Sequence, residues 1–154
     1  MNAYTKQYQQ NQVATASPEQ ILLMLYDGAI RFVRRAITAA ENNDTVDKLQ
    51  GISKCLAIIA EFSNSLNHEI GAHFAEDLDG LYHFMMRELD AARKDSGTNH
   101  LKTVENLLMD LKQTWEEAVA IHRKEQVAAL SKQHHHGDRG NFATPPQGRL
   151  VAAG

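Results

Sequence analysis

Histidines and carboxylates are the side chains of this chain best suited to chemistry, because together they bind metal ions. A di-iron site in a helical bundle needs a glutamate three residues before a histidine, on one inward face. The positions three before the histidines of residues 68–122 hold Ser65, Ile70, Gly80, Gly97 and Val119. His68 and Glu69 with His73 resemble a zinc-protease motif that is one residue too long, and Gly71 favours a turn there. The sequence therefore predicts no metal site.

Other catalytic motifs are also missing from the sequence. There is no glycine-rich phosphate loop and no G-x-S-x-G element. The single cysteine, Cys55, falls within a helical apolar pattern, where a buried and inert thiol is expected. Residues 134–136 are three histidines, which could bind a metal weakly but are expected to belong to a solvated tail. We expect no catalytic residue and no cofactor.

The overall composition narrows the class of protein. At 154 residues the chain is long enough for one domain with a core. The formal net charge of −3, without a basic stripe, argues against nucleic acid as a partner. One cysteine, no visible signal peptide and no apolar run of bilayer length predict a cytoplasmic protein with no membrane insertion.

Four segments show helical periodicity, and the first has the clearest start. Ser17, Pro18 and Gln20 form the signature of a capping box with proline in the first turn, so a helix is expected from there to about Asn42. Three more helices are expected near residues 49–67, 74–94 and 101–118. Polar stretches flank this folded domain (17–130): an N-terminal cap segment (1–16) and a disordered tail (131–154).

Mostly apolar residues recur at spacings of three and four in the last three helices, which is typical of helices that pack at a shallow angle. These predicted core seams are Leu49, Ile52, Leu56, Ile59, Ser63 and Leu66; Phe74, Leu78, Leu81, Met85 and Leu89; and Leu101, Val104, Leu108, Leu111, Trp115 and Ala118. Because the connections are short, neighbouring helices must run antiparallel. The predicted fold is all-α, an antiparallel up-down-up-down four-helix bundle.

Asp27-Gly28 would suit a hairpin turn, but helical spacing continues on both sides of it. We therefore interpret Gly28 as a mid-helix glycine that costs about 1 kcal/mol against alanine and admits a close neighbour.

The first helix has more apolar surface than one core face needs. One stripe is predicted to face the core: Leu22, Leu25, Ala29, Phe32 and Ala36. A second stripe lies about 100° away: Leu23, Tyr26, Ile30, Val33 and Ile37. Tyr82 and Met86, with Ile58 and Phe62, add similar surplus on the neighbouring helices. Either these helices have wide core faces, or the second stripes line a groove for a partner helix.

The N-terminal segment could cover such a groove. Tyr4, Tyr8 and Val13 are the larger apolar side chains of an otherwise polar stretch. They could press against the bundle, or residues 1–16 could be a disordered leader.

The sequence motifs of this chain resemble those of the flagellar secretion chaperone family FliS. The resemblance rests on Ser17-Pro18 followed by the block Leu25-Tyr26-Asp27-Gly28-Ala29-Ile30, and it covers about residues 1–122. It extends to further positions along the chain: Tyr4, Tyr8, Leu66-Asn67, Gly71, Leu78, Leu81-Tyr82, Leu89, Leu107-Leu108, Leu111 and Trp115. Phe62 stands where the family often has leucine, and the tail after about Leu130 matches nothing in the family.

The resemblance implies a non-enzymatic cytoplasmic export chaperone. Such a protein binds the disordered C-terminal segment of flagellin, prevents its premature polymerisation and delivers it to the flagellar export gate. It also implies that the N-terminal segment can lie over the binding surface until the client displaces it. The predicted partner-binding residues are Tyr4, Tyr8, Leu23, Tyr26, Ile30, Phe62, Tyr82 and Met86. The alternative is a self-associating helical-bundle adaptor, a homodimer when free, with no flagellin client.

Overall fold

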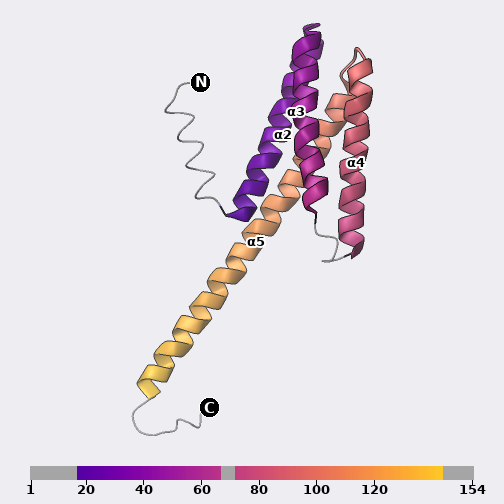
Figure 1. Cartoon of the computed structure of the whole chain (residues 1–154). Coiled ribbons are helices and arrows are strands. Elements are labelled where there is room, and N and C mark those ends of the chain that lie inside the picture. Colours follow the sequence, from indigo (N-terminus) through magenta and orange to yellow (C-terminus); the bar gives the residue numbers. More distant parts are fainter. Residues whose placement is uncertain (1–16, 67–71, 144–154) are drawn as a thin grey trace. The chain divides into compact units, whose positions relative to one another are not determined.

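Four helices make up the part of the chain that the computed structural model describes, residues 17–66 and 72–143 (Figure 1). They are α2 (Pro18–Glu41), α3 (Thr45–Ser65), α4 (Ala72–Lys94) and α5 (Asn99–Ala143). These residues contain no strand, so the prediction of an all-α fold with four helices is confirmed.

Helix α2 begins with the predicted capping box. The Ser17 hydroxyl accepts a hydrogen bond from the Gln20 backbone N–H at 3.2 Å, and the Ser17 N–H donates to the Gln20 side chain at 3.0 Å. These two bonds satisfy amide donors that the first turn of a helix leaves unpaired. At its other end the chain turns through Asn43, which has a φ of 58°, a left-handed conformation that asparagine tolerates better than most residues. The turn then leads into α3 with Asp44 as N-cap.

Contacts between helices show that neighbours run in opposite directions. Arg34 pairs with Glu105 and Asp27 pairs with Lys112, so α2 and the first part of α5 are antiparallel. The buried Lys48, near the start of α3, donates to the Asp95 carbonyl just beyond α4. Figure 1 shows the same alternation from α2 to α5. The arrangement agrees with the predicted up-down-up-down bundle.

The core consists of one inward face from each helix. The predicted seam of α5 is buried at Leu101, Val104 and Leu108, whereas in the other helices the buried face only partly coincides with the predicted one. In α2 both stripes enter the core: Tyr26, Ile30 and Val33 of the second stripe are at most 5% exposed, and Ala29 and Ala36 of the first are fully buried, whereas Leu25 is 37% exposed. In α3 the buried residues include Cys55 and Phe62, while Leu49 is exposed. Of the two readings left open for the second stripe, the burial supports a wide core face. Each helix packs on two neighbours, so a wide apolar face is needed and its centre depends on the packing.

Two glycines lie where α2 and α3 approach each other. A Cβ atom added to Gly51 would lie 2.8 Å from the Phe32 carbonyl oxygen and 3.1 Å from the Ala36 Cβ atom. At Gly28 an added Cβ would lie 3.5 Å from the Ile58 Cδ1 atom, an ordinary contact. Gly28 is thus buried beside a neighbour, as predicted, but the tightest approach is at Gly51.

The chain divides into two units after Trp115, residues 1–115 and residues 116–154. In the second unit, α5 continues to Ala143. Residues 131–143, which were expected to belong to the disordered tail, form the last part of this helix. The N-terminal cap segment and residues 144–154 lie outside the described residues.

Within the described ranges, no helix has the combined length and apolar character of a membrane span.

Candidate partner-binding surface

A hydrogen-bonded aromatic cluster joins α2, α4 and α5. The hydroxyl oxygens of Tyr26 and Tyr82 are 2.7 Å apart, and the Trp115 indole N–H donates to the Tyr26 oxygen at 3.1 Å. The Phe62 ring stacks on Tyr26 with 4.4 Å between ring centroids and also lies beside Tyr82. The cluster satisfies the two buried hydroxyls, as a stable core requires.

Burial sets the chemistry of the two tyrosines. Desolvation raises the pKa of Tyr26, although hydrogen bonds from Tyr82 and Trp115 act in the opposite direction. The pKa of Tyr82 is also raised, first by burial and then by its hydrogen bond to Tyr26. Both phenols are therefore neutral near pH 7 and act as hydrogen-bonding groups of the core.

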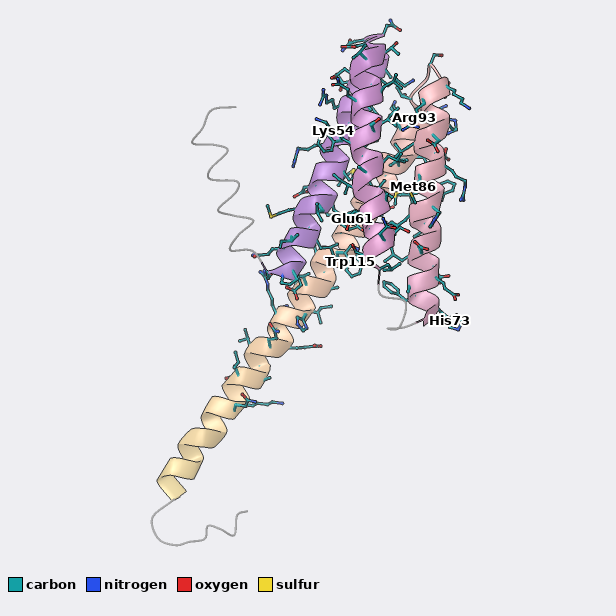
Figure 2. The ribbon with its side chains drawn as sticks, in the orientation of Figure 1. Lys54, Glu61, His73, Met86, Arg93 and Trp115 are labelled. Atoms are coloured by element: carbon teal, nitrogen blue, oxygen red, sulfur yellow. The ribbon has the colours of Figure 1, made fainter. Side chains whose placement is uncertain are left out.

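The predicted partner-binding residues fall into three groups. Tyr26, Ile30, Phe62 and Tyr82 are core residues with exposed fractions of 0%, 5%, 6% and 2%. They do not line an open groove in this structure, so a direct contact with a partner would require the core to open. Leu23 and Met86 are half-buried, and Met86, labelled in Figure 2, packs against the core. Tyr4 and Tyr8 lie outside the described residues.

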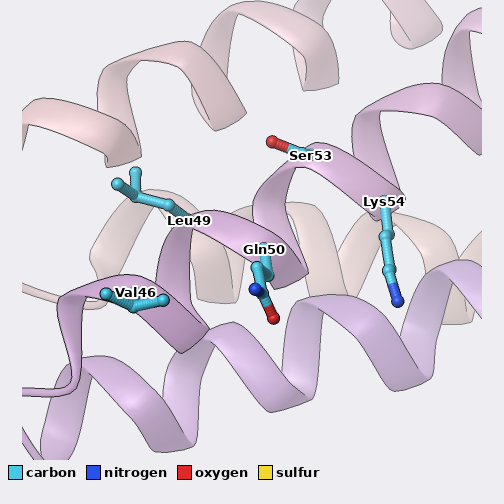
Figure 3. A pocket seen from close by; sticks show the side chains of 5 residues that line it. All are labelled: Val46, Leu49, Gln50, Ser53 and Lys54. Carbon is cyan, nitrogen blue, oxygen red and sulfur yellow. The ribbon is translucent and has the colours of Figure 1, made fainter.

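One partly exposed apolar surface runs along α2 and α3, and we call it the α2–α3 face. Its members are Leu25, Phe32, Val46 and Leu49. Lys54 of α3 lies over the Phe32 ring of α2, 5.4 Å from the centroid, which connects the two helices on this side. Near the start of α3, Val46, Leu49, Gln50, Ser53 and Lys54 line an open, mostly apolar pocket of about 370 Å³. Figure 3 shows these five side chains projecting from successive turns of α3.

A second exposed apolar surface lies on α4. Phe74, Leu81 and Phe84 are 59%, 37% and 36% exposed, and Phe74 makes an edge-on contact with Trp115. Phe74 and Leu81 were predicted to belong to the core seam, which is wrong, because the neighbouring Ala75 and Tyr82 are buried instead; the other predicted residue between them, Leu78, is buried as expected. The sequence did carry a signal for this surface, since Leu81 and Tyr82 are adjacent apolar residues that cannot both face inward.

The surface also contains ion pairs between α2 and α5. Asp27 accepts from Lys112 at 2.6 Å, and Arg34 donates to Glu105 at 2.7 Å. Both pairs are partly exposed and so contribute little to stability. They explain why a charged residue at position 27 is accommodated within an apolar stretch.

The search for reactive groups gives no candidate catalytic centre. Within residues 17–66 and 72–143, no three histidine, cysteine or carboxylate side chains lie close enough together to hold a metal ion. Cys55 is fully buried, and desolvation raises the pKa of its thiol to about 12, so the thiolate is not populated at neutral pH.

The fold and its surfaces define a class of protein: a four-helix bundle with a hydrogen-bonded core and two partly exposed apolar faces. The chain belongs to the FliS family, because residues 1–122 match the model of that family, described as flagellar protein FliS.

Curated relatives support this assignment. The flagellar secretion chaperone FliS of Bacillus subtilis is 36% identical over 125 residues, which is 81% of this chain and 92% of the relative. Those of Campylobacter jejuni and Salmonella typhimurium are 33% and 32% identical, over 79% and 76% of this chain and 92% and 87% of the relatives. The resemblance seen in the LYDGAI block is thereby confirmed.

Proposed function

We propose that this protein is a cytoplasmic export chaperone that acts by binding and not by catalysis. Its client is the C-terminal segment of flagellin, which it keeps from polymerising and delivers to the flagellar export apparatus. Membership of the FliS family carries this proposal, together with relatives that are named flagellar secretion chaperones.

The α2–α3 face supports binding of an amphipathic client helix. It presents apolar side chains over two adjacent helices and includes the open pocket around Leu49. A disordered segment that folds on such a surface spends several kcal/mol on ordering, so affinity must come from many apolar contacts. Of the predicted contact residues, Leu23 and Met86 keep enough exposure for direct contact, and the buried four would act by shaping the bundle.

For the N-terminal segment we retain the proposal of competition with the client. If residues 1–16 cover part of the binding surface, deleting them leaves the bundle folded and increases client affinity or association rate, because a competing segment is gone. If the deletion weakens binding, Tyr4 and Tyr8 contact the client or the export gate instead.

Titration with a peptide of the flagellin C-terminal segment tests the proposed function. We expect binding at micromolar concentrations by calorimetry and a gain of peptide helix by circular dichroism. Leu49→Glu, which places a charge in the pocket, should weaken binding at least about tenfold, the effect of roughly 1.4 kcal/mol. Met109→Glu makes a similar change at an exposed residue of α5 and should leave affinity unchanged.

Absence of both binding and helix gain with the unmodified protein would overturn the proposal. If Leu49→Glu and Met109→Glu weaken binding equally, flagellin remains the proposed client but the α2–α3 face is rejected as its binding site.

A further inference from the structure

An exposed seam with heptad spacing runs along α4. Its members follow one another at intervals of three, four and three residues: Phe74, Asp77, Leu81 and Phe84. All four are exposed, although three of them are large and apolar. Spacing of this kind is the pattern with which one helix packs along another. The bundle core uses the neighbouring face of α4; Phe74, at one end of the seam, packs edge-on against Trp115, but all four seam residues remain exposed.

The C-terminal part of α5 carries a second seam with the same spacing. It consists of Ala120, Arg123, Val127 and Leu130, again at intervals of three, four and three. All four are exposed, and Val127 and Leu130 are each 65% exposed. From Arg123 onward these residues lie beyond the region that matches the family model, which ends at residue 122. The seam therefore extends beyond what the family comparison explains.

The two seams match when aligned in parallel. Position by position the pairs are Phe74 with Ala120, Asp77 with Arg123, Leu81 with Val127, and Phe84 with Leu130. Three pairs are apolar and the fourth is an acid with a base. We propose that the C-terminal part of α5 from one copy of this chain packs in parallel along the α4 seam of a second copy.

Charge complementarity selects this pairing over the alternatives. Packed in parallel, two α4 seams would place Asp77 against Asp77, and two α5 seams would place Arg123 against Arg123, which like-charge repulsion disfavours. Packed antiparallel, two copies of either seam would place the charged residue against Leu81 or Val127 and leave it without a partner of opposite charge. Within the described residues neither Asp77 nor Arg123 has an ion-pair partner, so both are available. Residues 123–154 hold five lysines and arginines against two acids, in a chain whose net charge is −3.

Gly80, next to the α4 seam, supports a close approach by another helix. A Cβ atom added there would meet nothing within 4 Å, so no contact within the described residues requires the glycine. Glycine in the middle of an exposed helix is unfavourable. A bare backbone beside Leu81 lets a second helix lie close to α4.

A charge exchange tests the proposal with the full-length protein. Sedimentation equilibrium at low salt should show reversible self-association of the unmodified chain. Asp77→Arg or Arg123→Asp should each raise the dissociation constant at least about tenfold, because each places like charges in the seam. The double variant D77R/R123D should restore association to near the original value.

Matched controls place the same charge changes off the seams. Glu76→Arg on α4 and Lys132→Asp on α5 alter exposed residues on other sides of their helices, and both should leave association unchanged. Association that is absent in the unmodified protein, or not restored in the double variant, would overturn the proposal. Unchanged association of the variant V127E/L130E would also overturn it, because these substitutions remove the apolar pairs of Leu81 with Val127 and Phe84 with Leu130.

Disulfide trapping distinguishes a second copy from contact within one chain. In the variant L81C/V127C, oxidation should give a covalent dimer on a non-reducing gel, since paired seam positions bring Cα atoms within disulfide range. Cys55 is buried and should not interfere. A band of monomer size with an internal disulfide would overturn the proposal, and L81C/A129C, with its second cysteine off the seam, should cross-link poorly.

These outcomes are independent of the proposed function. Flagellin-peptide binding at the α2–α3 face should persist in D77R and in R123D, so failure of one proposal does not imply failure of the other.

Discussion

The two parts of α5 carry similar apolar spacing in opposite surroundings. In the first part, Leu101, Val104 and Leu108 are fully buried. In the second part, Val127 and Leu130 are each 65% exposed although they continue the same helix. The contrast shows that spacing of three and four predicts a helix and an apolar seam. It does not show whether another helix of the same domain covers that seam.

The sharpest test of this contrast is one substitution made in both parts of α5. Leu108→Ala should destabilise the protein by about 2–5 kcal/mol, because it removes buried methyl groups and leaves a cavity. Leu130→Ala should change the free energy of unfolding by less than about 0.5 kcal/mol at concentrations where the chain is monomeric. Urea denaturation followed by circular dichroism measures both. Equal effects would contradict the difference in burial.

Two glycines extend the comparison to backbone packing. Gly51→Ala should destabilise the bundle by about 1–3 kcal/mol, because the new Cβ would overlap the Phe32 carbonyl oxygen. Gly80→Ala should stabilise α4 by up to about 1 kcal/mol, because its Cβ enters open space. Thermal unfolding of the two variants should therefore shift in opposite directions. A shift in the same direction would show that one of the two environments is misassigned.

The buried hydroxyl pair contributes a smaller stabilisation. Tyr82→Phe keeps the ring and removes one partner of the 2.7 Å hydrogen bond, while Tyr26 keeps the Trp115 donor. We expect a loss of about 0.5–1.5 kcal/mol, the usual value of one hydrogen bond. Tyr26→Phe should cost more, because it leaves both Tyr82 and Trp115 without their shared partner. Chemical denaturation of both variants tests this order.

Thiol labelling perturbs the protein least and compares a buried position with an exposed one directly. Cys55 should react with a thiol reagent only when the bundle opens, because it is fully buried and its pKa is raised to about 12. In Val127→Cys the added thiol should react at the rate of a free cysteine, with Cys55 as an internal reference. Rapid labelling of Cys55 in the folded protein would contradict the packing around it.

Much of the fold was predictable because its signals are local. The capping box at Ser17, the helical period through Asp27-Gly28 and the short connections depend on neighbouring residues, and four helices in this order were correctly predicted. The surface was harder to predict. Tyr26 and Phe62 were predicted to meet a partner but are buried, whereas Leu49 and Phe74 were predicted to be core and are exposed. In α2, α3 and α4 the buried face is centred beside the predicted seam, whereas in α5 Leu101, Val104 and Leu108 are buried as predicted.

The sequence alone determined the helices, their order and the family, because capping residues, periodicity and the LYDGAI block are properties of neighbouring residues. Only the tertiary structure decided which residues of two adjacent apolar stripes enter the core. That choice depends on how large side chains such as Tyr26 and Tyr82 interlock across helices, and on the close approach at Gly51. It also decided which apolar residues remain outside, and those residues now define the surfaces where a client helix and a second copy are proposed to bind.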